Sequence, residues 1–527
     1  MKLTEVVVFS PKGAKGGRSA GSQKHVFFHL FALGVLLLAG VSSCLSPGPG
    51  TGEPRFNFRG FSDRDSVLYF ALREADQVED ISNRIFVFSE IAAAYLVRRE
   101  LSEAQAVLTH LDELSQRVTA RSERAEILVE LSELKFQVNN VEAGLRALNE
   151  ALDIAATMSD QGARGALYER IIQVAFEVGE DAFPVVARTI DLVLVIDDLH
   201  TRATVLTNTA RRYQRQGLGQ SGNILIQQAI PAAGSIGSPW RRAAALSAVA
   251  LRFRAVGDAR SATQYADRAA DQLIGLTVLS LPDDDARVIA DVGAQLAEMD
   301  RFSTAAQVVA AIPQSHIRAD ALVTLGEAYA RSGDRPSAFV MFSRAASEAE
   351  RSGNPSLIAG AYASIADGYL SIGEEQLAYL NAEFARSIMD GLADEFSRSS
   401  VLVRLVPVYV AAGAGVELEA EALELQELFP RIQVLTTLTR EYASRGEGAD
   451  ARRPLDTIRT NEAEFAAASE SLIFSVLQQY VALFLIEDAL ELVVEIRSPF
   501  LRARAFAGIG SAQRADGEFY SGPIVVP

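Results

Sequence analysis

One pattern repeats along most of this chain and limits what it can fold into. An alanine-rich segment with apolar residues at helical spacing ends in an aromatic residue, a short polar turn follows, and a second alanine-rich segment begins. The turn residues recur roughly every forty positions. They are Asn140, Gly179, Gly217, Gly257, Asp300, Gly333, Gly373, Gly413, Gly446, Glu487 and Gly517. This arrangement predicts amphipathic helices in antiparallel pairs.

A single helix pair cannot bury its own apolar face, so neighbouring pairs must stack into one continuous body. Small residues let the two helices approach closely, and aromatic side chains fill the space beside them. Glycine at the turn tolerates a positive φ, and in Gly257-Asp258 and Gly333-Asp334 the acidic residue is placed to cap the next helix. The pattern therefore predicts an all-α fold, a right-handed α-solenoid of stacked antiparallel helix hairpins.

The clearest copy of the pattern begins at Leu322 and resembles the tetratricopeptide repeat. Leu325, Gly326, Tyr329, Gly333, Ala338, Phe342 and Ala345 match that family's Leu-Gly, Tyr, Gly, Ala, Phe and Ala positions at its spacing. Leu322 stands where the family prefers tryptophan, and no proline closes this copy. The resemblance covers roughly residues 80–517. It implies a superhelix whose concave groove takes extended or helical peptides.

The charge of the chain narrows the classes of partner. The formal net charge is -17, and residues 1–43 contribute +4, so the remainder carries -17 minus 4, or -21. An acidic body repels phosphate backbones, which argues against nucleic acid as a partner and against general adhesion to anionic lipid.

Cys44 is the only cysteine, so no internal disulfide supports the fold. Lys135 is the only lysine after residue 25, which marks the N-terminal segment as a separate kind of sequence.

The N-terminal segment has the order of a secretory signal peptide. The apolar run VFFHLFALGVLLLAG follows a cationic region, precedes small residues and is short for a membrane-spanning helix. Val41-Ser42-Ser43-Cys44 resembles the bacterial lipobox. The resemblance implies a lipoprotein that is cleaved before Cys44 and carries lipid on the Cys44 sulfur, with a further acyl chain such as palmitate on the freed amine. An uncleaved anchor with an incidental cysteine is the alternative.

These features divide the chain into four predicted parts. Residues 1–43 are a cleaved lipoprotein signal peptide, and 44–61 are the lipidated cysteine with a flexible tether rich in proline and glycine. Residues 62–517 form the solenoid, with a possible bend near 233–239, and 518–527 are a C-terminal tail. Asp63 to Val78 reads as an extra leading helix before the first repeat.

Other clusters of polar residues have simple interpretations. The histidines are scattered over different repeats and no cysteine pair exists, so we expect no metal site. Asp283-Asp284-Asp285 reads as the charged start of a helix. Residues 217–222 imitate a dinucleotide fingerprint, but no strand precedes them, so we expect a repeat turn and no cofactor. The segment with Glu417, Glu419, Glu421, Glu424 and Glu427 predicts a solvated acidic face, or a docking patch for a basic partner.

Together these observations predict a non-enzymatic, lipid-anchored scaffold at the cell envelope. It would lie outside the cytoplasm, on the periplasmic side of the cytoplasmic or the outer membrane, and bind a protein or peptide partner in its concave groove. We expect no catalytic residue, and a monomer outside any complex. One alternative is an envelope enzyme, for example peptidoglycan-processing, with titratable side chains converging in the groove. Another is a cytoplasmic regulatory adaptor with a misassigned N-terminus.

Overall fold

The computed structural model describes residues 54–59, 61, 66–276, 280–460, 469–512 and 518–519, and residues 54–527 make one compact unit. Cys44, the lipobox and the apolar run of the predicted signal peptide lie outside the described residues. Within them the chain forms 24 α-helices and no strand, so the predicted all-α solenoid of stacked hairpins is confirmed. None of the described helices combines the length and the apolar character needed to cross a bilayer.

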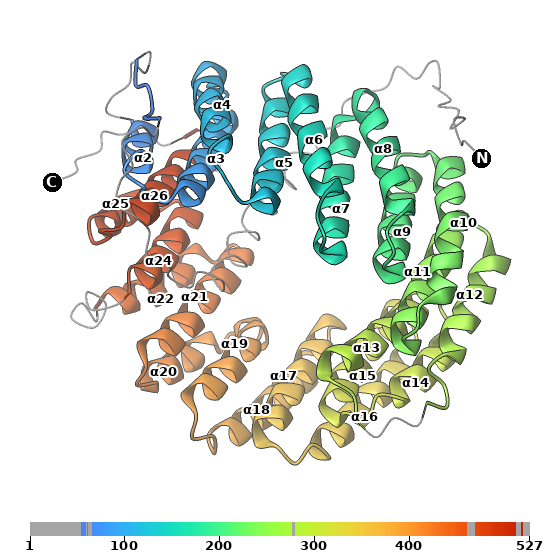
Figure 1. The fold of residues 1–527 in the computed structure, drawn as a ribbon. Coiled ribbons are helices and arrows are strands. Elements are labelled where there is room, and N and C mark those ends of the chain that lie inside the picture. The colour runs from blue at the N-terminus through green and yellow to red at the C-terminus, as the bar shows by residue number, and fades with distance from the viewer. Residues whose placement is uncertain are drawn as a thin grey trace, which may run out of the picture. The chain divides into compact units, whose positions relative to one another are not determined.

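From α3 to α25 the helices come in consecutive pairs, and each pair is followed by the next (Figure 1). The pairs are α3 (Ile81–Val97) with α4 (Leu101–Ser115), α5 (Arg121–Gln137) with α6 (Val141–Ala156), α7 (Gln161–Val178) with α8 (Phe183–Leu194), α9 (Leu199–Arg215) with α10 (Gly219–Ser235), α11 (Pro239–Ala255) with α12 (Ala259–Asp271), α13 (Asp283–Glu298) with α14 (Phe302–Ala310), α15 (Ser315–Arg331) with α16 (Arg335–Glu350), α17 (Pro355–Ser371) with α18 (Glu375–Met389), α19 (Glu395–Ala411) with α20 (Gly415–Glu424), α21 (Leu428–Ser444) with α22 (Gly448–Thr460), and α24 (Glu470–Ala482) with α25 (Ile486–Val493). A short 3-10 helix, η2 (Glu180–Ala182), leads into α8.

Every one of these pairs turns on a residue with positive φ. The eleven residues are Arg99, Asn139, Gly179, Gly217, Gly257, Asp300, Gly333, Gly373, Gly413, Gly446 and Phe484. Except before α8, the residue after it is the N-cap of the second helix: Asp334, for example, accepts a hydrogen bond from the Ser337 amide at 3.1 Å. Asn140, which the sequence indicated as a turn residue, has that capping role for α6, and the residue with positive φ in this turn is Asn139. In the last of these pairs it is Phe484 and not Glu487.

At the α15–α16–α17 contact the helices pack closely because two glycines face one aromatic ring. A Cβ atom added to Gly326 would lie 2.6 Å from Cε1 of Phe342, and one added to Gly368 of the next pair would lie 2.9 Å from the same atom. Phe342 is fully buried between them, as are Ala338 and Ala345. A larger residue at either glycine would push the two helices apart.

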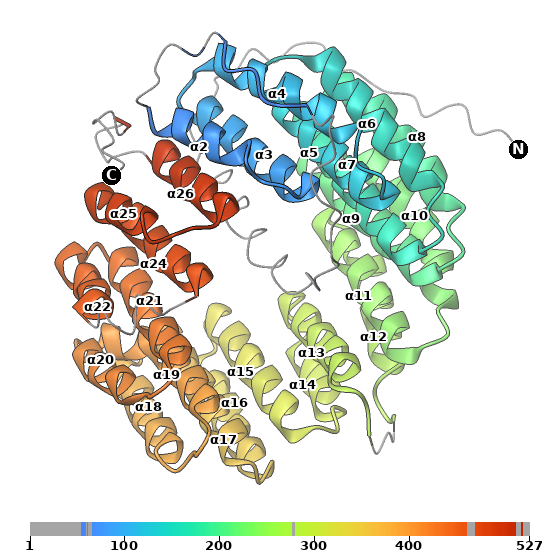
Figure 2. The same ribbon diagram turned by 60° about the vertical axis from the view of Figure 1, so that its left-hand side comes forward.

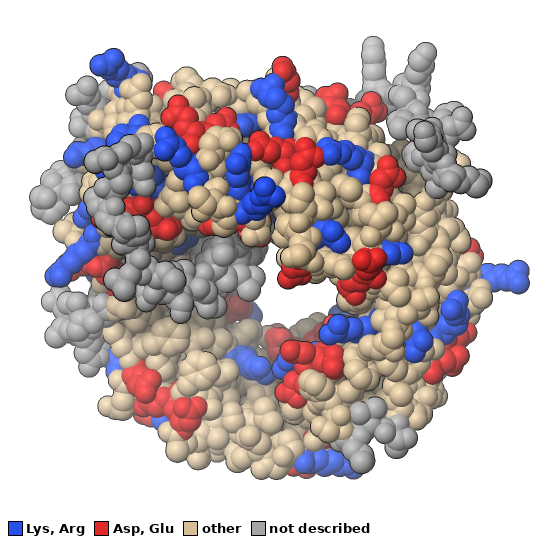
Figure 3. Space-filling model, viewed as in Figure 1, with Lys and Arg blue, Asp and Glu red and all other residues tan. Residues whose placement is uncertain are grey.

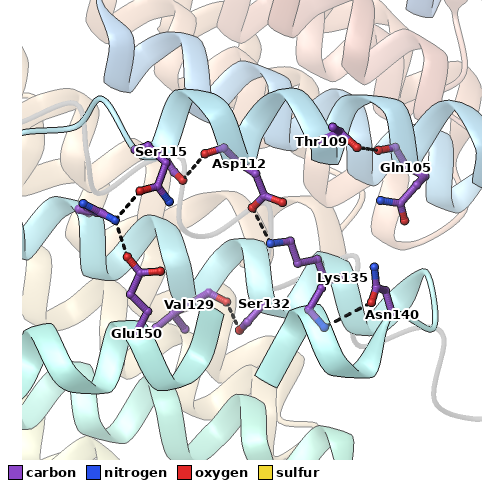
Figure 4. A network of polar contacts seen from close by, with 12 residues as sticks. Gln105, Thr109, Asp112, Ser115, Val129, Ser132, Lys135, Asn140 and Glu150 are labelled. Atoms are coloured by element: carbon purple, nitrogen blue, oxygen red, sulfur yellow. Dashed lines mark hydrogen bonds and ion pairs between the residues drawn. The ribbon is translucent and has the colours of Figure 1, made fainter. Parts of the chain in front are cut away.

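Polar contacts also join successive pairs (Figure 4). The ammonium of Lys135 in α5 is buried and forms an ion pair with Asp112 of α4. Within the next pair, Arg124 of the same helix α5 forms an ion pair with Glu150 of α6. Lys135 is the only lysine in the described part of the chain. Its ion pair joins α5 to α4, so it contributes to the packing of two successive repeats.

Two helices remain outside the consecutive pairs, α2 (Val67–Ala75) and α26 (Pro499–Ser511), and they pair with each other. Leu68 lies against Gly510, and the rings of Phe70 and Phe506 are 5.8 Å apart. Glu74 forms an ion pair with Arg502. The residue numbers of these contacts rise along α2 and fall along α26. The two helices are therefore antiparallel, as in the other pairs. The helix that the sequence presented as an extra leader is thus the second helix of the last repeat.

The same closure brings α26 against α3, the first helix of the first complete pair. The rings of Phe500 and Phe86 are 6.3 Å apart, and Arg98 donates to the carbonyl of Gly510 at 3.3 Å. The helices from α2 to α26 therefore form a closed circuit, in which α2 and α26 lie side by side in both ribbon views (Figure 2).

The end of the predicted tether is part of this packed body. Phe56 is buried, and its ring centroid lies 5.4 Å from that of Phe88 and 5.3 Å from that of His110. The backbone amide of Phe56 donates to Asp76 at 2.9 Å. Within the segment 44–61, packing against the helices therefore begins at or before Phe56.

Candidate binding surface

The first helices of the pairs line the inside of the circuit. Each one packs against the first helix of the next pair, and Figure 1 shows these helices nearer the central opening than their partners. We define the inner face by polar residues of these helices, which recur about one repeat apart. They are Glu90, Glu130, Glu133, Arg170, Asn208, Arg211, Asp291, Thr324, Glu327, Ser364, Asp367 and Arg404. Figure 3 shows acidic and basic side chains bordering the opening.

Hydrogen bonds connect this face from one repeat to the next. Arg170 donates to Glu133 at 2.8 Å, and Asn208 donates to Glu169 at 2.9 Å. Further round, Arg404 donates to Ser364 at 3.5 Å. Because each bond joins equivalent positions of neighbouring first helices, polar contacts connect α5, α7 and α9, and again α17 and α19, on a rigid helical support.

Charges on this face act on each other beyond the nearest neighbour. Burial raises the pKa of Asp320 in α15, while Arg404 in α19 opposes that rise, although α17 lies between the two helices. Burial also raises the pKa of Asp367 in α17, and the charge of Glu441 in α21 raises it further. A concave surface explains both effects, because charges two repeats apart then face the same space.

An acidic part of the inner face lies next to the closure. The pKa of Glu130 is raised to about 7, mainly by burial and to a smaller extent by the carboxylates of Glu133 and Glu90, while a hydrogen bond from Ser89 and the charge of Arg170 oppose the rise. Burial also raises the pKa of Glu90, against the stabilising charge of Arg504. Titratable side chains therefore do converge here, as the enzyme alternative requires.

Two small cavities lie away from this acidic region. One, of about 50 Å³, is lined by residues that include Phe61, Ser66, Tyr95 and Arg98. The other, of about 340 Å³, lies between the starts of α9 and α11 and is lined by residues that include His200 and Arg241. No group of residues that could hold a metal ion occurs in the described part of the chain.

Arg211 of the inner face belongs to a basic group on α9 and α11. We call it the arginine cluster, and it consists of Arg211, Arg212, Arg215 and Arg252. Burial lowers the pKa of Arg212 and of Arg252, and the charge of Arg211 lowers both further. Among the described residues none of the four guanidiniums forms an ion pair; Arg212 donates only to the side-chain oxygen of Gln173, at 3.2 Å.

The predicted solvated acidic face is wrong for its central residues. Glu419 and Glu421 are buried, and they form ion pairs with Arg453 and Arg386 on the neighbouring outer helices. Glu417 also pairs with Arg386, at 3.1 Å. The carboxylates hold three second helices together, because their partners come from repeats before and after them in the chain. Glu424 and Glu427 are exposed.

The remaining predicted residues have structural positions. Asp283, Asp284 and Asp285 form the first turn of α13, as their charge indicated. Gly217 is a turn residue, and Gly222 packs in α10 close to the backbone of Ala210. Leu325 is buried, and Tyr329 stacks on Phe302 with ring centroids 4.4 Å apart. These residues, which match the tetratricopeptide pattern, therefore contribute to packing within the repeats. The inner-face residues carry no motif; only their spacing in equivalent helix positions could have indicated them.

No protein-family model and no curated protein matches the chain. Among solved structures, the chain is similar to Ton1535 from Thermococcus onnurineus NA1, with 14% identity, 73% of this chain and 99% of that chain covered, and a TM-score of 0.28. It is also similar to the human IFIT1 dimer with m7Gppp-AAAA, with 13% identity, coverages of 84% and 95% and a TM-score of 0.26. A Rap protein complexed with Competence and Sporulation Factor shows 12% identity, coverages of 81% and 99% and a TM-score of 0.24. Identities of this size do not indicate a shared function.

Proposed function

We propose that this protein is a non-enzymatic, lipid-anchored scaffold outside the cytoplasm that binds a protein or peptide partner along its inner face. The observation that carries the binding proposal is the row of polar residues on stacked first helices, with hydrogen bonds between neighbouring helices at α5 to α9 and at α17 to α19. A partner lying along it would meet donors and acceptors from several repeats at once, held by helices that are packed on both sides.

The position at the membrane rests on the sequence of residues 1–44. The cationic start, the apolar run and the Val41-Ser42-Ser43-Cys44 box support cleavage and lipidation at Cys44. Two or three acyl chains would anchor the body stably, where a single chain gives marginal binding. Phe56 packs on the helices, so the tether available between lipid and body is the segment from Cys44 to about Phe56.

Site-specific photo-crosslinking tests the binding proposal. A crosslinking residue at Thr324, which is exposed on the inner face, is expected to capture a discrete partner in cells that produce the protein at its normal level. The matched control is the same residue at Val340, which is 54% exposed on the outer helix α16. Capture at Val340 but not at Thr324 would contradict the use of the inner face.

Metabolic labelling tests the anchor separately. We expect labelled palmitate in the wild-type protein, none in Cys44→Ala, and wild-type incorporation in a Ser46→Ala control. Unlabelled wild-type protein in the membrane fraction would exclude lipidation at Cys44.

A further inference from the structure

Inner arginines outside the arginine cluster have partners in the described protein, and Arg404, for example, donates to Ser364 at 3.5 Å. Arg170 forms an ion pair with Glu133, and Arg504 forms one with Glu90. Arg211 and Arg215, by contrast, lie one helical turn apart with like charge, and neither has an ion pair among the described residues. Nε of Arg211 is buried without a hydrogen-bond partner. The cluster therefore holds donors and positive charge that the described protein does not satisfy.

We infer that the arginine cluster is the docking surface for an acidic segment of the partner, with two or more carboxylates close together. This inference rests on the proposed function and names the chemistry that the inner face recognises at α9 and α11. Guanidinium groups match carboxylates in two parallel hydrogen bonds, and such bonds are among the strongest that a surface can offer.

The occupant is a peptide segment and not a nucleic acid, for reasons of charge. The whole chain carries a net charge of -17, which repels a long polyanion before it reaches the cluster. Carboxylates also flank the cluster on both sides, with Glu177 on α7 and Glu298 on α13. These carboxylates would repel a continuous phosphate backbone that extends past the cluster, whereas a short acidic segment can end within it.

Fluorescence anisotropy with labelled hexaglutamate tests the inference directly. We expect saturable binding to the wild-type protein that weakens as salt increases, and a loss of affinity of about tenfold or more in Arg211→Gln/Arg215→Gln. Arg344→Gln is the matched control, because Arg344 is an exposed arginine on the outer helix α16, and we expect it to bind like wild type. Circular dichroism of each variant verifies that the helices are intact.

Three results would overturn the inference. They are the absence of saturable hexaglutamate binding, equal affinity in the double variant, and tighter binding of hexathymidylate than of hexaglutamate. Crosslinking at Thr324 distinguishes failure of this inference from failure of the proposed function. A partner captured there, together with no hexaglutamate binding, leaves the scaffold standing and removes the acidic docking segment.

Discussion

Arg504, in the last described helix, donates hydrogen bonds to both carboxylate oxygens of Glu90, at 2.9 and 3.1 Å, across 414 positions of sequence. The guanidinium carbon lies 4.9 Å from the ring centroids of both Phe86 and Phe474. Arg504 is only 9% exposed, so a single side chain joins α26 to α3 and α24 in the interior of the closure.

Removing this side chain is expected to loosen the closure. Arg504→Ala leaves Glu90 without its partner and empties the space between the aromatic rings, so we expect the free energy of unfolding to fall by about 3 kcal/mol. Arg504→Met keeps the apolar stem and should recover part of that loss. Urea denaturation measures the change, and hydrogen exchange should accelerate in α2 and α3. Arg344→Ala is the control, and equal unfolding of the two alanine variants would contradict this role of Arg504.

Substitutions at two glycines of α26 distinguish the effect of the closure on stability from the effect of helix propensity. A Cβ on Gly510 would overlap Cδ2 of Leu68 in α2, whereas nothing lies within 4 Å of a Cβ on Gly508. We expect Gly510→Ala to lower the free energy of unfolding by about 1–3 kcal/mol, and Gly508→Ala to raise it by about 0.5–1 kcal/mol. Thermal unfolding distinguishes the two, and stabilisation by both substitutions would show that α2 does not press on α26 at this position.

The core of the best-matching repeat offers a similar test. Gly326→Ala should lower the free energy of unfolding by about 1–3 kcal/mol, because its Cβ would meet the fully buried ring of Phe342. When Phe342→Leu is added, the double variant should lose less free energy of unfolding than the sum of the losses in the two single variants. Gly448→Ala, where nothing lies within 4 Å, is the control. Strict additivity of Gly326→Ala and Phe342→Leu would mean that the two residues do not compete for space.

Glu130 makes stability depend on pH. Its pKa is raised from 4.5 to about 7 in the folded protein, so the folded state holds the proton more tightly than the unfolded chain. The contribution of Glu130 to stability is therefore greatest below pH 4.5 and falls as pH rises from there to about 7, by about 2–3 kcal/mol. Glu130→Gln should remove this slope and exceed wild type in stability at pH 8. Denaturation at pH 5 and pH 8 measures it, and a carboxyl titration near 4.5 by NMR would contradict it.

The repeat was predictable because its determinants are local. Gly326 and Phe342 lie sixteen positions apart (342 minus 326), and the turn glycines have a conformational preference that their own residue type reveals. The solenoid and most of its turns therefore follow from the sequence. The lipid anchor stays a prediction, since Cys44 lies outside the described residues.

The closure was not predictable in the same way. The apolar face of α2, with Leu68 and Leu72, looks like that of any amphipathic helix, and its partner lies more than four hundred residues away. Glu419 and Glu421 were misread for a related reason: their arginine partners belong to other repeats. The arginine cluster was equally hidden, because only stacking brings Arg252 beside Arg211.

The pairing of α2 with α26 has a consequence for how the protein is made. During synthesis α2 leaves the ribosome early with Leu68, Leu72 and Ala75 uncovered, and its partner emerges only after hundreds of further residues. A chain that stops before Pro499 leaves apolar surface uncovered on α2, α3 and α24, against which α26 packs. Such fragments offer apolar surface to chaperones and proteases, so the architecture itself distinguishes finished from unfinished polypeptides.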